Sequence, residues 1–227
     1  MTDQRANLEW RDATHEGGVV PVSLQFDDPY YSLDDGVAET QHVFLNGNDL
    51  PARFRDGFHV AELGFGTGLN FLVTLAAWRR AGVAGKLQFT SFEAFPMPIA
   101  DMIRALDAFD GLPMDFIEDD ADMELLSPQI SGPDFELRVV VGDARETLPV
   151  WDGCADAWYL DGFSPAKNPE LWGADLMAQV AAHTATGGTV ATYTAAGFVR
   201  RGLADAGFSI ERVQGFGRKR HMVRGVL

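Results

Sequence analysis

The residues best suited to chemistry begin at a glycine-rich turn. An apolar run ends in Glu62-Leu63, glycines follow at positions 64, 66 and 68, and an apolar helical pattern starts at Leu69. This order predicts a strand, a tight turn and a helix N-terminus. Glycine lets the backbone approach a ligand closely, and the first turn of a helix offers free N–H groups to a polar or anionic group. The turn is therefore the first candidate for a ligand site.

The glycine spacing distinguishes two kinds of ligand. A dinucleotide fingerprint has the spacing G-x-G-x-x-G, which would require glycine at Leu69. The observed spacing, with Glu62 two residues ahead of the first glycine, resembles the first motif of Rossmann-like methyltransferases that use S-adenosylmethionine (SAM). The resemblance implies SAM as the cofactor and makes a nicotinamide oxidoreductase the weakest interpretation.

Acidic residues follow the next two predicted strands. Glu93 follows the strand expected over 87–92, where a carboxylate can accept hydrogen bonds from both hydroxyls of a ribose. Asp143 follows the strand expected over 137–142 and can accept a hydrogen bond from an adenine amino group. Asp143 can equally cap the segment that begins at Arg145, and both roles are compatible.

A third carboxylate precedes a loop rich in Gly, Pro and aromatic residues. A strand expected over 156–160 delivers Asp161 at its carboxyl end, where methyltransferases keep the group that orients the nucleophile. Phe163 and Trp172 in the loop suit a flat substrate. The alternative is an ordinary loop in which Asp161 is only a cap.

The order of apolar segments indicates how these residues are positioned. It predicts an α/β fold with a seven-stranded, mostly parallel sheet and an antiparallel last strand. This arrangement resembles the sheet of Rossmann-like class I SAM methyltransferases. Strands are expected at 58–63, 87–92, 137–142, 156–160, 188–194, 209–214 and 221–226. Helices are expected at 68–81, 97–109, 169–183 and 196–206. The last two strands are too close for a helical crossover, so they should form a hairpin through Gly215-Phe216-Gly217.

The remaining segments are expected to extend this core without a second domain. We interpret residues 1–227 as one domain, with a core over 57–227 and an N-terminal extension over 1–56 that contributes to the active site. The extension should begin with a short hairpin or arm that turns at Gly17-Gly18. An acidic connection over 110–134 should contain a short helix.

Composition narrows the class of protein. The chain has 227 residues, of which 46% are hydrophobic, so it can bury a full core. No apolar run is long enough to span a bilayer, and the N-terminus lacks the apolar segment of a secretory signal. A single cysteine, Cys154, fits a reducing cytoplasm. The five histidines show no metal-ligand spacing, so no metal site is expected.

The charge of the chain is unevenly distributed. The net charge of −15 argues by itself against a nucleic-acid partner. Residues 195–227, however, hold seven Arg or Lys and two Asp or Glu, whereas residues 107–136 contain no Arg or Lys. The basic tail is either a solvated edge or a docking surface for an anion.

Longer motifs resemble one family, the methyltransferase domain of the bifunctional tRNA-modifying protein MnmC and its stand-alone relatives. The matching stretches lie between residues 26 and 220 and are Phe26-Asp27-Asp28-Pro29-Tyr30-Tyr31-Ser32, Gly36-Val37-Ala38-Glu39-Thr40, Val43-Phe44-Leu45-Asn46-Gly47-Asn48, the glycine turn with Asn70-Phe71, Asp161 to Pro169, Thr194 to Leu203, and Gly215 to Arg220. The flavin oxidase half of the bifunctional protein is not expected in this chain.

This resemblance implies a reaction and a set of site residues. SAM would methylate the amine of 5-aminomethyl-2-thiouridine at the tRNA wobble position, giving 5-methylaminomethyl-2-thiouridine, with Asp161 as the catalytic residue. A separate flavin oxidase chain is a further partner that the resemblance suggests. The implied cofactor-binding residues are Tyr31, Glu62, Gly64, Phe65, Gly66, Thr67, Gly68, Asn70, Glu93, Asp143 and Ala144. The implied substrate-binding residues are Tyr30, Phe163, Pro165, Trp172, Arg200, Arg218, Lys219 and Arg220.

Two other functions stay open. An acidic SAM methyltransferase could act on a small cationic amine, and tRNA binding that weakens with salt would exclude this. A non-catalytic SAM- or nucleotide-binding module would bind its ligand without turnover on any tRNA.

Overall fold

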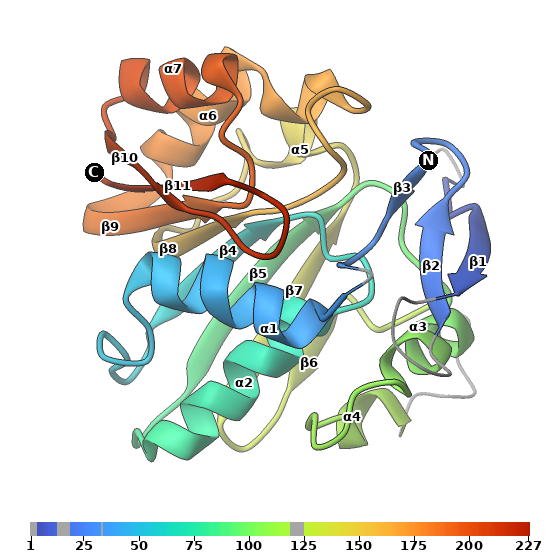
Figure 1. Cartoon of the computed structure of the whole chain (residues 1–227). Helices are drawn as coiled ribbons and strands as arrows, with labels where there is room; N and C mark the ends of the chain where they lie inside the picture. Colours follow the sequence, from blue (N-terminus) through green and yellow to red (C-terminus); the bar gives the residue numbers. More distant parts are fainter. Residues whose placement is uncertain (1–3, 13–18, 33, 119–124) are drawn as a thin grey trace.

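The computed structural model describes residues 4–12, 19–32, 34–118 and 125–227. In this part of the chain the main sheet has eight strands, in the spatial order β10-β11-β9-β8-β4-β5-β7-β6. The strands are β4 (His59–Leu63), β5 (Leu87–Glu93), β6 (Gln129–Ser131), β7 (Phe135–Val141), β8 (Ala155–Leu160), β9 (Thr184–Thr192), β10 (Ser209–Gln214) and β11 (His221–Val226). Helices cover both faces of this sheet (Figure 1).

The pairing of the strands confirms the predicted mostly parallel sheet. β7, β5, β4, β8 and β9 are joined by parallel ladders. β11 is antiparallel to both of its neighbours, β9 and β10, and the predicted final hairpin is present. The central strands β4 and β8 are almost entirely buried, as expected for parallel strands covered on both faces.

The predicted count of seven strands is wrong, because β6 adds an eighth. This strand pairs antiparallel with β7 at the sheet edge and has only three residues. Ile130 is its one apolar residue, and prolines 128 and 133 flank it. Such a short edge strand is specified by the neighbour it pairs with, and its own sequence has no alternating pattern to reveal it.

Two groups of helices bury the two faces of the sheet. The helices are α1 (Gly36–Thr40), α2 (Leu69–Ala81), α3 (Ile99–Leu106), α4 (Asp115–Glu118), α5 (Ala144–Thr147), α6 (Ala174–Ala182) and α7 (Gly197–Asp205). One apolar core lies between the sheet and α2, α3 and a π-helix (Gln41–Leu45). The other lies under α5, α6 and α7, which Figure 1 shows together on the opposite face.

Two predicted helices differ from those observed. The helix expected over 97–109 is α3, which starts after Pro98, since proline is tolerated only at the start of a helix. The helix expected over 169–183 is broken at Gly173, whose extended backbone separates a 3₁₀ turn (Pro169–Trp172) from α6. The short helix expected within 110–134 is α4.

The N-terminal segment forms a small sheet of its own beside the carboxyl ends of the main strands. β1 (Leu8–Asp12) pairs antiparallel with β2 (Val19–Ser23), and β2 pairs with β3 (Asp28–Pro29). This confirms the predicted hairpin, although the expected Gly17-Gly18 turn lies outside the described residues. Figure 1 shows this sheet next to α3, away from α6 and α7.

Candidate active site

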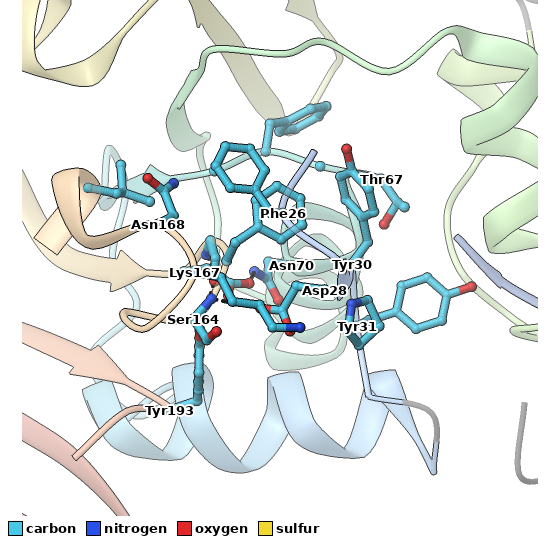
Figure 2. A pocket seen from close by; sticks show the side chains of 18 of the residues that line it. Phe26, Asp28, Tyr30, Tyr31, Thr67, Asn70, Ser164, Lys167, Asn168 and Tyr193 are labelled. Carbon is cyan, nitrogen blue, oxygen red and sulfur yellow. Dashed lines mark hydrogen bonds and ion pairs between the residues drawn. The ribbon is translucent and has the colours of Figure 1, made fainter. Parts of the chain in front are cut away.

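A cavity of about 830 Å³ opens where β4, β5, β7 and β8 end. Its walls are the glycine turn, the segments that follow these strands, an N-terminal stretch from Gln25 to Phe44, and the β10–β11 loop. The carboxyl ends of parallel strands are the usual ligand site of open α/β sheets, and this volume suits a cofactor-sized ligand. Figure 2 shows side chains from the N-terminal stretch, the glycine turn and the loop after β8 converging on one space.

The glycine turn has a backbone that disfavours other residues. Gly64, Gly66 and Gly68 all have positive φ angles, of +87°, +55° and +80°. A Cβ atom on Gly66 would lie 3.0 Å from Cδ1 of Tyr30, and one on Gly64 would lie 3.2 Å from Cα of Gly162. The turn therefore needs glycine both for its conformation and for close approach to the cavity walls.

Glu93 is buried at the end of β5 and is held by backbone donors. Its Oε2 accepts from the N–H of Gly66 at 2.9 Å, and its Oε1 accepts from the N–H of Phe95 at 2.7 Å. Burial raises the pKa of Glu93, and the backbone N–H groups oppose this rise. The carboxylate faces the cavity with lone pairs left for the hydroxyls of a ligand.

Asp143 caps α5, as one of its two predicted roles requires. Its Oδ1 accepts from the N–H of Arg145 at 2.9 Å, and its Oδ2 lies 2.6 Å from Nη2 of the same residue. The guanidinium holds the pKa of Asp143 below its usual range. Both residues line the cavity, so an adenine amino group would share this carboxylate with Arg145.

Asn70 connects the glycine turn to two carboxylates. Its Nδ2 donates to Oε1 of Glu62 at 2.8 Å and to Oδ2 of Asp161 at 2.7 Å. The hydroxyl of Thr40 donates to Asn70 Oδ1 at 2.7 Å, which leaves the amide nitrogen to face the carboxylates. Ser91 donates to the other oxygen of Glu62. This network fixes the orientation of the polar groups in the cavity floor.

Glu62 differs from its expected place. It is fully buried beneath the cavity and does not line it, and its two oxygens accept from Asn70 and Ser91. Burial raises its pKa well above the ordinary value. In this structure Glu62 supports Asn70, and a direct contact with a ligand would need a different arrangement.

Asp161 lies half-buried at the end of β8 with both oxygens occupied. Besides Asn70, the N–H of Gly162 donates to its Oδ1 at 2.8 Å. Burial is the main cause that raises the pKa of Asp161, to about 6, and the two hydrogen bonds oppose it. The group can thus be ionised at neutral pH while remaining a much better proton acceptor than an exposed aspartate.

Aromatic rings form one side of the cavity. Phe163 stacks on Phe26, with ring centroids 4.6 Å apart, and contacts Tyr30 edge-on at 5.1 Å. Trp172 does not join them, which corrects its predicted role as a stacking surface. It is 1% exposed, and its Nε1 donates to the carbonyl of Phe163 at 2.9 Å, so it supports the loop from behind.

The N-terminal segment is fastened to the loop after β8. Oδ2 of Asp28 accepts from the N–H of Ser164 at 2.7 Å. Lys167 reaches across to the backbone carbonyl of Asp27, and its Nζ lies 3.6 Å from Oδ1 of Asp28. Figure 2 shows Lys167 and Asp28 next to one another beside Asn70. Tyr31 instead sends its hydroxyl to the carbonyl of Ala105 in α3, at 2.7 Å.

The predicted basic residues separate into two groups. Arg218 and Lys219 line the cavity mouth, whereas Arg200 and Arg220 do not. Partial burial is the main cause that lowers the pKa of His221, and the nearby charges of Arg212, Arg220 and Arg200 lower it further. Lys219 differs from the rest because its Nζ is paired with Oε1 of Glu39 at 2.8 Å.

The structure brings most of the predicted site residues to the cavity. Those that line it are Tyr30, Tyr31, Gly64, Phe65, Gly66, Thr67, Asn70, Glu93, Asp143, Ala144, Asp161, Phe163, Arg218 and Lys219. Those that do not line it are Glu62, Gly68, Pro165, Trp172, Arg200 and Arg220. Pro165 and Gly68 are buried within the two loops that form the walls.

Comparisons with known proteins agree with this site. A family model described as S-adenosyl-L-methionine-dependent methyltransferase matches residues 121–227. The "tRNA 5-methylaminomethyl-2-thiouridine biosynthesis bifunctional protein MnmC" of Pseudoalteromonas atlantica is 42% identical over 100% of this chain and 34% of its own length. Its counterpart in Stutzerimonas stutzeri is 42% identical over 99% of this chain and 35% of its own length.

The chain is therefore similar to S-adenosyl-L-methionine-dependent methyltransferases. It is homologous along its whole length to MnmC proteins, and it spans about a third of the length of these curated relatives. The crystal structure of MNMC2 from Aquifex aeolicus shares the fold, with a TM-score of 0.77 and 24% identity over 98% of this chain and 71% of that one.

The cavity suits SAM in shape and chemistry. A side chain at Gly66 would crowd the ring of Tyr30, and the buried Glu93 presents a carboxylate to hydroxyl donors. We expect Gly64, Gly66, Glu93 and Asp143 to hold the nucleoside part of the cofactor. Among the described residues, no group of His, Cys, Asp or Glu is arranged to hold a metal ion. In that same part of the chain, no helix has the length and apolar character needed to cross a bilayer.

Several residues that line this cavity were not singled out by the sequence. Thr40, Asp28, Arg145 and Tyr193 all line the cavity. Thr40 and Asp28 belong to stretches that resemble the MnmC family, and that was the available signal. Nothing in the local sequence distinguishes Thr40 or Asp28, since each forms its hydrogen bond with a residue that is far away in the chain.

Proposed function

We propose that this methyltransferase modifies the wobble uridine of tRNA, converting 5-aminomethyl-2-thiouridine to 5-methylaminomethyl-2-thiouridine. The observation that carries the proposal is the placement of Asp161, which Asn70 and Gly162 hold at the cavity floor, beneath a wall of aromatic rings. A carboxylate orients an amine, and the rings can stack on a base. The names of the MnmC relatives support the same substrate.

The residues of the cavity can carry out the transfer mainly by positioning. Bound SAM supplies an electrophilic methyl group. The amine must be neutral to attack it, so Asp161 accepts a hydrogen bond from the amine and directs its lone pair. The new N–C bond forms as the C–S bond breaks, and the surplus proton on nitrogen leaves to Asp161 or to water. The raised pKa of Asp161 suits it to receive that proton.

The base can reach this site because a wobble nucleotide lies in a loop. An unstacked base is extruded at small cost and can stack on aromatic rings. Phe163 and Tyr30 line the cavity, and Phe26 covers one face of Phe163. We infer that the base replaces Phe26 or stacks beside it.

The tRNA backbone would dock on arginines near the cavity mouth. Arg200, Arg212, Arg218 and Arg220 form no ion pair within the described residues, and Nε of Arg200 is buried without a partner there. By contrast, Arg11, Arg55 and Arg79 are each paired with an acid. Unpaired guanidinium groups close to one another fit phosphates, and acids farther away are screened over about 8–10 Å.

One experiment tests the proposed function directly. The protein is incubated with SAM and tRNA that carries 5-aminomethyl-2-thiouridine, and the nucleosides are then analysed by mass spectrometry. We expect 5-methylaminomethyl-2-thiouridine to appear, and to be absent with tRNA whose wobble base is unmodified uridine. Absence of the product with a folded, SAM-binding protein would overturn the proposal.

A second candidate is a methyltransferase of a small cationic amine. Asp28, Glu39 and Asp161 all line the cavity, and the net charge of −15 would attract such a substrate. In that case the rate on tRNA would be negligible beside the rate on the amine.

Three further parts of the proposal concern the whole protein. We propose that it acts in the cytoplasm, that residues 1–227 form a single domain, and that a separate flavin oxidase chain is its partner.

A further inference from the structure

The ion pair between Lys219 and Glu39 belongs to the cavity wall. Nζ of Lys219 lies 2.8 Å from Oε1 of Glu39 and 3.9 Å from the centroid of the Tyr193 ring. The Glu39 side chain is only 14% exposed, and all three residues line the cavity. The ammonium group is therefore engaged by an acid and by the face of a ring, unlike the neighbouring guanidinium groups of Arg218 and Arg220.

Both partners of Lys219 are attached to the residues that hold Asp161. Glu39 precedes Thr40 in α1, and Thr40 donates to Asn70, which donates to Asp161. The hydroxyl of Tyr193 donates to the carbonyl of Gly162 at 2.8 Å, and the N–H of Gly162 is the other donor to Asp161. Lys219 thus lies where the N-terminal segment, the loop after β8 and the β10–β11 loop meet.

We propose that Lys219 and Glu39 are positioning residues for methyl transfer, in which Lys219 provides the fixed positive charge that keeps Asp161 ionised and Glu39 holds Lys219 in place. This inference rests on the proposed function for its kinetic test. It gives Lys219 a role in the chemistry, in place of the phosphate contact that the sequence suggested.

The charged and titratable groups around Asp161 come from four elements. They are Lys219 from the β10–β11 loop, Glu39 from α1, Glu62 from β4, and Tyr193 after β9. Lys219 lowers the pKa of Asp161, whereas Glu39 raises it. Lys167 and Asp28 also line the cavity, and their charges are paired with each other. Loss of Lys219 should therefore raise the pKa of Asp161. Glu39→Gln should lower it, because this variant removes the negative charge but keeps an oxygen that can accept from Lys219.

The test compares Lys219→Met and Glu39→Gln with the wild type. We measure kcat against pH at saturating SAM and tRNA. The acidic limb of the profile should move up by about 0.5–1 pH unit in Lys219→Met and down by a similar amount in Glu39→Gln, as expected for one charge at intermediate dielectric. Lys219→Arg should restore the wild-type limb.

A matched pair of control variants tests for a general effect of surface charge. Lys86 and Glu136 form an exposed ion pair at 3.2 Å between the ends of β5 and β7 that lie away from the cavity. Lys86→Met and Glu136→Gln carry the same charge changes and should leave the pH profile of kcat unmoved.

The salt dependence of tRNA binding gives a further check. It should be the same in Lys219→Met as in the wild type, since the proposal does not make Lys219 a phosphate contact.

A second measurement does not require tRNA at all. The carboxyl carbon of Asp161 is titrated by ¹³C NMR, its signal being assigned by its loss in Asp161→Asn. Opposite shifts of the titration midpoint in the two variants support the positioning role even if the protein proves inactive on tRNA, which would overturn only the proposed function. If Lys219→Met does not fold, the direction of the midpoint shift in Glu39→Gln tests the proposal alone.

The proposal is overturned if an active enzyme shows wild-type limbs and midpoints in both variants. It is equally overturned if both variants lose rate to the same degree at every pH, because that result indicates a merely structural pair.

Discussion

The side-chain amide of Asn70 lies 2.7 Å from Oδ2 of Asp161 and so joins the first turn of α2 to the end of β8. These two residues are separated by 91 positions in the chain. The contact links the glycine turn, where the cofactor is expected, to the carboxylate expected to orient the substrate. Substitutions at the glycine turn should therefore affect cofactor binding, whereas substitutions at Asp161 should affect catalysis.

The first prediction concerns the glycine turn. Gly66→Val should abolish SAM binding, because a side chain there strains a backbone with φ of +55° and enters the space next to Tyr30. Glu93→Ala should weaken SAM binding by roughly 1–3 kcal/mol. Calorimetry measures both.

The control for the turn is Gly57→Val. Gly57 has a similar φ of +68°, but a Cβ atom at this position would meet no other atom of the described residues within 4 Å. This variant should therefore bind SAM as the wild type does. Unchanged affinity in folded Gly66→Val would refute the placement of the cofactor at the turn.

The second prediction concerns catalysis by Asp161. Asp161→Ala should retain SAM and lose methyl transfer by a factor on the order of 10² or more, because the amine is no longer oriented. In the wild type the rate should rise with pH through about 6, as Asp161 ionises. Single-turnover rates with labelled SAM measure both effects. Near wild-type turnover in Asp161→Ala would mean that Asp161 is only a cap.

The third prediction concerns stability and pH. The pKa of Asp161 in the folded protein, about 6, lies above the ordinary value of 3.8, so the folded state binds more protons between these values. The contribution of Asp161 to the free energy of unfolding is then fully present below pH 4 and is lost as the pH rises through 6. The stability of Asp161→Asn relative to the wild type should therefore be greater at pH 7 than at pH 4, by on the order of 1–2 kcal/mol. Urea unfolding at the two pH values measures the difference, and an equal difference at both would contradict it.

The fourth prediction concerns the N-terminal segment. Asp28→Ala removes the acceptor for the N–H of Ser164 and one partner of Lys167. We expect faster hydrogen exchange at Ser164 and a higher KM for tRNA, with SAM affinity changed little. Asp28→Asn keeps an acceptor oxygen and should retain most of the protection. Equal exchange in Asp28→Ala and the wild type would show that this contact does not fasten the segment.

The fifth prediction concerns RNA docking. Reversal of charge at Arg218 and Arg220, both to Glu, should raise the KM for tRNA tenfold or more and leave SAM affinity unchanged. The salt dependence of wild-type binding should correspond to about three to five phosphates, and it should be smaller in the variant. Arg80→Glu with Arg138→Glu is the control, because both arginines are exposed and lie outside the cavity lining. Full activity of the Arg218 and Arg220 variant at physiological salt would place the RNA on another surface.

The sequence by itself determined the parallel core of the sheet and the carboxylates at the ends of its strands. Apolar strands, glycines at 64, 66 and 68, and acids at 93, 143 and 161 are local features. Each follows from period, turn chemistry or the end of a strand, so it can be found without knowledge of the fold. The parallel order then brings these strand ends to one edge of the sheet.

Tertiary structure alone decided which side chains face the cavity and which support it. Trp172 is a stacking candidate in the sequence but is buried behind Phe163, and Lys219 lies in a basic run but pairs with Glu39. Lys219 pairs with a residue that is distant in the chain, and Trp172 donates a hydrogen bond to Phe163 only because the loop between them is folded. The strand β6 likewise depends on tertiary structure, since its hydrogen bonds are made with β7. Long-range pairing of polar groups leaves no periodic trace in a sequence, because burial and partner geometry arise only when the chain has folded.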